Sequence, residues 1–179
     1  MAEADDWDPE KHGLTYPPGT KITYRFPAKK GRGPVTLCWY DGGRTLSSPE
    51  DMKQLKKVWN YNAGSLIVGT AGKIVHGSHG AGACRIVPEE KMRAYKRPQR
   101  TIPRVKGHYW DFLNAIRTGG NAGSNFDYGG PLTEIPLLGV IALRMLGQEL
   151  KWDGPAMRFT NCPAANRHIN PPRREGWAL

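Results

Sequence analysis

The chain has 179 residues, of which 39% are hydrophobic and 23% charged, and its formal net charge at pH 7 is +10. This composition is typical of a globular protein with a sizeable core, and excludes a largely disordered chain. No run approaches the roughly 18 consecutive apolar residues of a membrane-spanning helix, and the acidic N-terminus lacks the apolar core of a secretory signal. We expect an acidic, flexible segment over residues 1–15 and a single domain over residues 16–179. We also expect no membrane contact and a cytoplasmic location, while export of a longer parent chain stays open.

The cysteines do not suggest a structural framework. Cys38, Cys84 and Cys162 are odd in number, far apart and without a C-x-x-C pair. This spacing favours neither disulfides nor a cysteine zinc site.

One segment concentrates the positive charge. Residues 91–106, "KMRAYKRPQRTIPRVK", carry seven basic side chains and no acidic one. Such a segment could bind nucleic acid by neutralising phosphates. Because no helix-turn-helix, zinc-finger or RNA-recognition signature accompanies it, a solvated connector is the favoured interpretation.

The first expected elements are two strands. Apolar and polar side chains alternate in "TKITYRF" (20–26) and in "PVTLCWY" (34–40), as in half-buried strands. The glycine-bearing link between them predicts an antiparallel pair. We expect Trp39 to pack in the core and Asp41 to cap the following turn.

A hairpin is expected next. "SLIVG" (65–69) and "GKIVH" (72–76) are β-rich runs joined through "GTAG". A phosphate-binding loop would need a helix after Lys73, whereas strand-forming residues follow it. A metal site is also disfavoured, because its possible ligands lie in a glycine-rich loop: His76, His79 and Cys84.

Three helices are expected. Ser48 offers an N-cap for a short helix, and "GHYWDFLNAIRTGG" (107–120) has helical apolar spacing before two glycines. "GGPLTEIPLLGVIALRMLG" (129–147) predicts a largely buried helix. Pro136 fits there if Thr133 is the cap, and otherwise must bend the helix.

A last strand in "AMRFTN" (156–161) completes the pattern. We therefore predict an α+β fold, a mainly antiparallel open-faced sheet with helices packed on one face.

Eight blocks, in order from Tyr16 to Trp177, resemble a known family. They are "YPPGTKITYRFPA", "PVTLCWYDGG", "GSLIVGTAGKI", "RIVPEEKM", "HYWDFLNAIRTGG", "SNFDYGGPLTEIPLLGVIALR", "KWDGPAMRFTN" and "AANRHINPPRREGW". The series is similar to the C-terminal domain of bacterial Gfo/Idh/MocA-type oxidoreductases. The resemblance implies two-domain enzymes, in which a Rossmann domain binds NAD or NADP and the C-terminal domain supplies an open sheet, much of the substrate pocket and usually the oligomer interface.

The family's catalytic motifs have no counterpart here. "GRG" (31–33) runs into Pro34 instead of continuing as G-x-G-x-x-G, and the Glu-Lys-Pro motif with the catalytic lysine is absent. The family's helical histidine and aspartate would precede Met1. We expect no catalytic, cofactor-binding or metal-binding residue in this chain, and an inactive chain by itself.

Four residues are candidates for substrate binding. Phe126, Asp127 and Tyr128 are expected in the loop before the long helix, although Asp127 could equally cap that helix. Glu134 lies in an apolar stretch, where a polar anchor to backbone or arginine is favoured over a substrate role. His108 begins a helix without an evident carboxylate partner, so a catalytic role is disfavoured. Trp152 and Asp153 are interpreted as structural.

The resemblance implies the substrate-binding and oligomerisation part of an NAD(P)-dependent oxidoreductase acting on a sugar, cyclitol or related polyol, without its dinucleotide-binding half. The expected partners are a small polyol, the missing Rossmann domain and further copies of the chain meeting through the open sheet face. A catalytically silent binding or scaffold module of the same fold is the alternative. Nucleic-acid binding through residues 91–106 is the third.

Overall fold

The structure is a computed structural model that describes residues 1–44, 63–77 and 81–177. The chain divides into two compact units, Met1–Arg44 with Arg104–Leu179 and Thr45–Pro103, where one domain was expected over residues 16–179. The helix expected from Ser48 lies outside the described residues.

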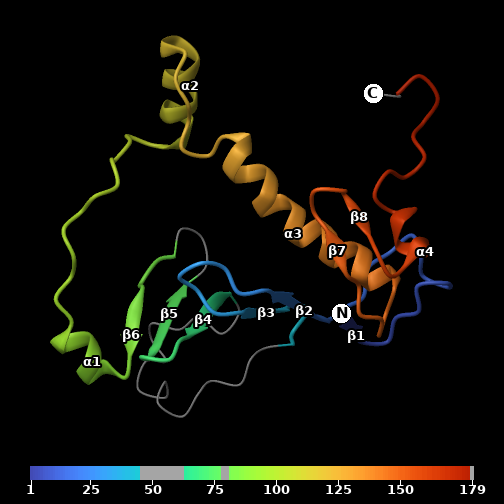
Figure 1. Cartoon of the computed structure of the whole chain (residues 1–179), viewed down its shortest axis with the longest axis horizontal. Helices are drawn as coiled ribbons and strands as arrows, with labels where there is room; N and C mark the ends of the chain where they lie inside the picture. The colour runs from blue at the N-terminus through green and yellow to red at the C-terminus, as the bar shows by residue number, and fades with distance from the viewer. Residues whose placement is uncertain (45–62, 78–80, 178–179) are drawn as a thin grey trace. The chain divides into compact units, whose positions relative to one another are not determined.

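The first unit contains a three-stranded antiparallel sheet in the order β1-β2-β3 (Figure 1). Its strands are β1 (Ala2–Ala4), β2 (Thr20–Phe26) and β3 (Val35–Tyr40). Ile22 lies opposite Trp39 in the register of β2 and β3, which confirms the predicted antiparallel pair.

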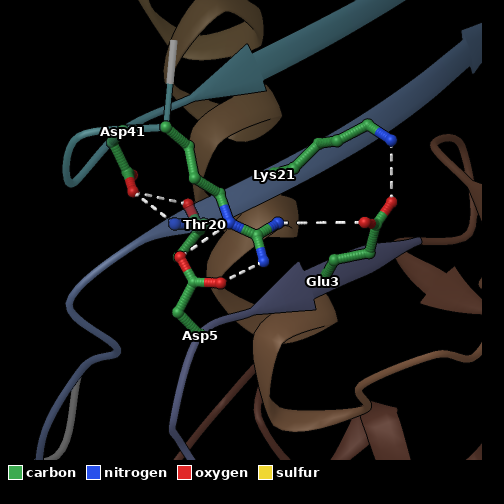
Figure 2. Close-up of polar contacts among 6 residues, drawn as sticks. Glu3, Asp5, Thr20, Lys21 and Asp41 are labelled. Carbon is green, nitrogen blue, oxygen red and sulfur yellow. Dashed lines mark hydrogen bonds and ion pairs between the residues drawn. The ribbon is translucent and has the colours of Figure 1, made fainter.

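The N-terminal segment is part of this sheet, although we expected it to be flexible. Ala2–Ala4 pairs with β2, and Glu3 forms an ion pair with Lys21 at 2.9 Å. Arg44, just after β3, makes a forked contact with Asp5 and a longer one with Glu3 at 3.8 Å (Figure 2). These contacts join residues far apart in the sequence, so composition alone did not reveal them.

Trp39 is not in the core, which corrects the prediction for this residue. Its side chain is 55% exposed, and its indole Nε1 donates a hydrogen bond to Asp41 Oδ2 at 3.2 Å. Asp41 Oδ1 accepts bonds from the backbone N–H and the hydroxyl of Thr20 (Figure 2), so Asp41 ties the start of β2 to the end of β3. Trp39 is exposed because the helix on this sheet packs on β1 and β2 and does not cover β3.

Two helices follow in this unit, α2 (His108–Thr118) and α3 (Phe126–Arg144). The predicted end of α2 is confirmed: Gly119 has φ 67°, the left-handed conformation that glycine adopts readily. The predicted start of α3 is wrong. Asn125, not Thr133, is the N-cap, and its side-chain oxygen accepts from the N–H groups of Asp127 and Tyr128.

Burial of α3 is confined to its second half, whereas we predicted a largely buried helix. Gly139 and Ala142 are buried, and Ala142 packs with Ile22 in the core beneath the sheet. Leu132 and Leu137 are each 57% exposed. Apolar periodicity therefore predicted the helix but overestimated how much of it the sheet covers.

A small hairpin and a short helix complete the first unit. They are β7 (Trp152–Asp153), β8 (Arg158–Phe159) and α4 (Pro163–Asn166). The strand predicted over residues 156–161 is thus only two residues long. The Asn166 side chain accepts from the Phe159 N–H at 2.7 Å and donates to its carbonyl at 3.0 Å, taking both backbone groups that could have extended the sheet.

The second unit holds an antiparallel sheet in the order β4-β5-β6 and a short helix. Its elements are β4 (Gly64–Val68), β5 (Lys73–Gly77), β6 (Arg85–Val87) and α1 (Glu89–Ala94). The β4–β5 pairing confirms the predicted hairpin, and Val75 packs with Val87 in the core. Sequence analysis missed β6 and α1.

The α+β class with antiparallel open sheets is confirmed, because every pairing among the described strands is antiparallel and helices accompany the sheets. The strands form small separate sheets in place of one. None of the helices in the described ranges is long and apolar enough to span a bilayer.

Candidate ligand groove

A groove of about 820 Å³ lies along α3, and its volume is within the range of small-molecule sites. One wall is a stripe of α3 residues at helical spacing, and the others come from the β7–β8 hairpin and the segment after α4. Its main lining side chains are Phe126, Glu134, Leu138, Ile141, Trp152 and His168.

A carboxylate and an indole meet in this groove. Trp152 Nε1 donates a 2.6 Å hydrogen bond to Glu134 Oε1, and both side chains are half-buried. The Trp152 ring packs against Phe159, with centroids 5.0 Å apart and a tilt of 58°. Because Phe159 is buried, the indole is held in one orientation, which in turn fixes the carboxylate.

The hairpin that presents Trp152 is clamped by an asparagine. Asn161 accepts from the Lys151 N–H at 2.8 Å and donates to the Glu149 carbonyl at 2.7 Å. These bonds satisfy backbone groups beside two strands that are too short to be stable alone. The position of Trp152 is therefore set by side-chain bonds as much as by strand pairing.

His168 lies at the edge of the groove after α4. Partial desolvation of its ring lowers the pKa below the ordinary value of 6.5, and the positive charges of Arg144 and Arg167 lower it further. The imidazole is therefore neutral at pH 7 and can both donate and accept a hydrogen bond.

The structure brings two of the four predicted binding residues into this groove. Phe126 and Glu134 line it, whereas Asp127 and Tyr128 do not. The prediction that residues 126–128 lie in a loop is wrong, because they form the first turn of α3. Glu134 is a polar anchor as favoured, although its partner is the Trp152 indole and not an arginine or the backbone.

Sequence analysis missed the part of the groove that lies far from α3 in the sequence. Trp152 was interpreted as structural, and Met157, His168 and Ile169 were not considered. The signal available for Trp152 was a lone carboxylate in an apolar helix, which needs a donor, together with an indole that needs an acceptor.

The other sequence candidates do not line the groove. "GTAG" joins the antiparallel strands β4 and β5, and His76 Nδ1 lies 2.8 Å from the Gly77 carbonyl oxygen. His79 lies outside the described residues, and no group of three potential metal ligands occurs among those described. His108 packs against Tyr109, with ring centroids 4.0 Å apart and a tilt of 41°.

The groove combines apolar walls with a few hydrogen-bonding side chains. Its polar side chains are the Glu134 carboxylate, the His168 imidazole, the Trp152 indole N–H and the hydroxyls of Ser124 and Thr133. A comparison with protein-family models finds none that matches the chain, and no curated protein matches it either.

Proposed function

We propose that this chain is the substrate-binding and assembly portion of an NAD(P)-dependent oxidoreductase similar to the Gfo/Idh/MocA type, and that it holds a sugar, a cyclitol or a related polyol. The observation that carries the proposal is the groove along α3, where Glu134 and Trp152 converge between apolar walls. The eight collinear sequence blocks favour the family.

The chemistry of the groove suits a polyol. Such a ring has apolar C–H faces and hydroxyl edges, so it packs against aromatic side chains and donates hydrogen bonds to a carboxylate. Glu134 Oε1 takes the indole N–H, and no bond to Oε2 occurs within the described part of the chain. Oε2 is therefore the acceptor that we assign to a substrate hydroxyl.

Assembly is supported by a row of apolar side chains on β3. Val35, Leu37 and Trp39 lie on the same sheet face as their partners in β2, and all three are exposed. An exposed apolar row of this kind is typical of protein interfaces. In this proposal, it is where copies of the chain meet.

The described residues do not fit a nicotinamide dinucleotide. Its pyrophosphate is held where a strand passes through a glycine-rich turn into a helix of a parallel sheet. Here, the glycine-rich turn of "GTAG" leads from β4 into an antiparallel strand. The role we propose is therefore binding and orientation of the polyol, with no hydride-transfer step assigned to this chain.

Saturation-transfer NMR with myo-inositol and D-glucose as probes tests the proposal. We expect transfer to at least one probe, and a loss of roughly tenfold in affinity for Glu134→Gln, which keeps an oxygen for the indole N–H but loses the charge. Phe126→Ala should weaken binding as well. Leu132→Ala is the matched control, because Leu132 is exposed on α3 outside the groove lining.

Absence of transfer to both probes would contradict polyol binding and favour the catalytically silent scaffold module. Equal losses in the groove variants and in Leu132→Ala would also contradict it, since the effect would then not belong to the groove.

A further inference from the structure

Helix α2 carries an apolar stripe that nothing in its unit covers. Tyr109, Phe112, Leu113 and Ile116 recur at the spacing of one helix face, and each is between 57% and 77% exposed. The helix has no buried residue. An amphipathic helix in a folded protein ordinarily buries this face, so the stripe needs a partner surface.

The opposite side of α2 is already engaged. Asp111 Oδ2 accepts a 2.7 Å hydrogen bond from the Gly123 N–H, in the turn that leads to α3. At 3.6 residues per turn, Asp111 lies about 150° around the helix from the centre of the stripe. The polar side therefore faces the chain's own turn, and the stripe points away from it.

We propose that α2 is a dimerisation helix whose stripe packs against the same stripe of a second copy, antiparallel about a two-fold axis. This inference rests on α2 alone and is independent of the proposed function. It also names a surface distinct from the β3 row (Val35, Leu37 and Trp39).

The stripe is self-complementary in the antiparallel direction. Successive stripe residues are three, one and three positions apart, and this spacing is the same in both chain directions. A two-fold axis between Phe112 and Leu113 therefore places each stripe residue opposite a stripe residue of the second copy. Tyr109 meets Ile116 of the partner subunit, and Phe112 meets Leu113 of the partner subunit. An isologous contact of this kind closes on itself and produces a dimer, not a fibre.

The area available is that of a weak specific dimer. The four side chains expose on the order of 500 Å² per copy, with a whole aromatic side chain taken as about 150–250 Å². Two copies then bury about 1,000 Å², near the lower bound for a specific interface. We expect a dissociation constant in the micromolar range.

The composition of the stripe favours a second copy over a membrane surface. The stripe contains no charged residue, so antiparallel packing buries no unpaired charge. Membrane-surface helices carry a strongly basic polar face, whereas α2 has Asp111 and a single arginine, Arg117.

Disulfide trapping tests the register directly. The background variant replaces the exposed thiols with serine, Cys38→Ser and Cys84→Ser. In it, Tyr109→Cys with Ile116→Cys should give a covalent dimer on a non-reducing gel. Either cysteine alone should give far less, because identical positions lie about 10 Å apart along antiparallel helices.

Sedimentation velocity at about 10 and 100 µM, concentrations that bracket a micromolar constant, supplies the second test. In a Leu37→Glu background, which removes association through β3, adding Leu113→Glu should leave the chain monomeric at both concentrations. Leu37→Glu is the matched control on β3 and should retain the α2 dimer. Association that persists unchanged in this double variant, or equal trapping by the single cysteine variants, would overturn the inference. Association already lost in Leu37→Glu alone would overturn it while supporting assembly through the sheet face.

Discussion

Arg44 joins the end of β3 to the two carboxylates of the N-terminal segment. Its guanidinium donates to both oxygens of Asp5 and lies 3.8 Å from Glu3, and the hydrogen bond from Arg44 lowers the pKa of Asp5 below the ordinary value of 3.8. A carboxylate with a depressed pKa stabilises the folded state above its unfolded-state pKa. That contribution disappears as the pH falls through the lower, folded-state value.

We predict that Asp5→Asn reduces the dependence of stability on pH at acid pH. In the wild type, the urea midpoint should fall as the pH drops from about 5 toward about 2, because folded Asp5 resists protonation while unfolded Asp5 accepts a proton. Asp5→Asn should be less stable at pH 6 and should lose part of this slope. Asp6→Asn is the neighbouring control, and a slope that is identical in wild type and Asp5→Asn would contradict the assignment.

Residue environments were predictable only where their cause is local. The left-handed Gly119 followed from the pattern at the end of α2. Trp39 was assigned to the core because its strand alternates, but burial depends on whether a helix covers that strand. Glu134 was assigned a polar partner on physical grounds, while the identity of Trp152 depended on the fold.

At the scale of elements, the crossing of α3 over β2 depends on Gly139, because glycine has no side chain to separate the helix from the strand. A Cβ at Gly139 would overlap the Tyr24 hydroxyl and lie 3.1 Å from Ile22 Cδ1. Glycine costs a helix up to about 1 kcal/mol relative to alanine. The close approach to the sheet offsets that cost.

We predict that Gly139→Ala destabilises the chain by about 1–3 kcal/mol through overpacking, despite its better helix propensity. Removing the hydroxyl with Tyr24→Phe should recover part of the loss. Gly130→Ala in the same helix is the control, because its Cβ would meet nothing within 4 Å, and it should be neutral or stabilising. Urea unfolding measures Gly139→Ala, its combination with Tyr24→Phe, and Gly130→Ala, and a Gly139→Ala protein as stable as wild type would show that the contact is loose.

Long periodic elements were predicted well, and short or side-chain-capped ones were not. β2, β3, the β4–β5 hairpin and α2 follow from alternation, helical spacing and glycine signals. The start of α3 was missed because Asn125 caps a stretch containing two prolines, which the sequence suggested was loop. β6 and α1 are too short to show a period.

At the scale of the molecule, the groove shows how far sequence reasoning extends. The α3 wall was partly accessible, because Glu134 stands out as a carboxylate in an apolar periodic stretch, whereas Phe126 was predicted in the loop before it. The opposite wall comes from residues 152–171. These residues reach α3 only through tertiary folding, which no local sequence pattern indicates. Local patterns thus identified part of one side of the candidate site and could not identify the other.

The last prediction concerns what the chain does by itself: it binds neither NADH nor NADPH and oxidises no polyol. Hydride transfer needs the nicotinamide held close to the substrate carbon and an acid–base group within hydrogen-bond reach of its oxygen. The described strands pair only antiparallel, and the glycine-rich turn after β4 enters another strand, so the phosphate-binding geometry of a dinucleotide fold has no counterpart in these residues. Titration of NADH and NADPH, followed by nicotinamide fluorescence, should give no saturable signal, and Lys73→Ala should behave as wild type. Micromolar binding with turnover of a polyol would contradict this prediction and would require a nucleotide site built differently from the strand–turn–helix arrangement.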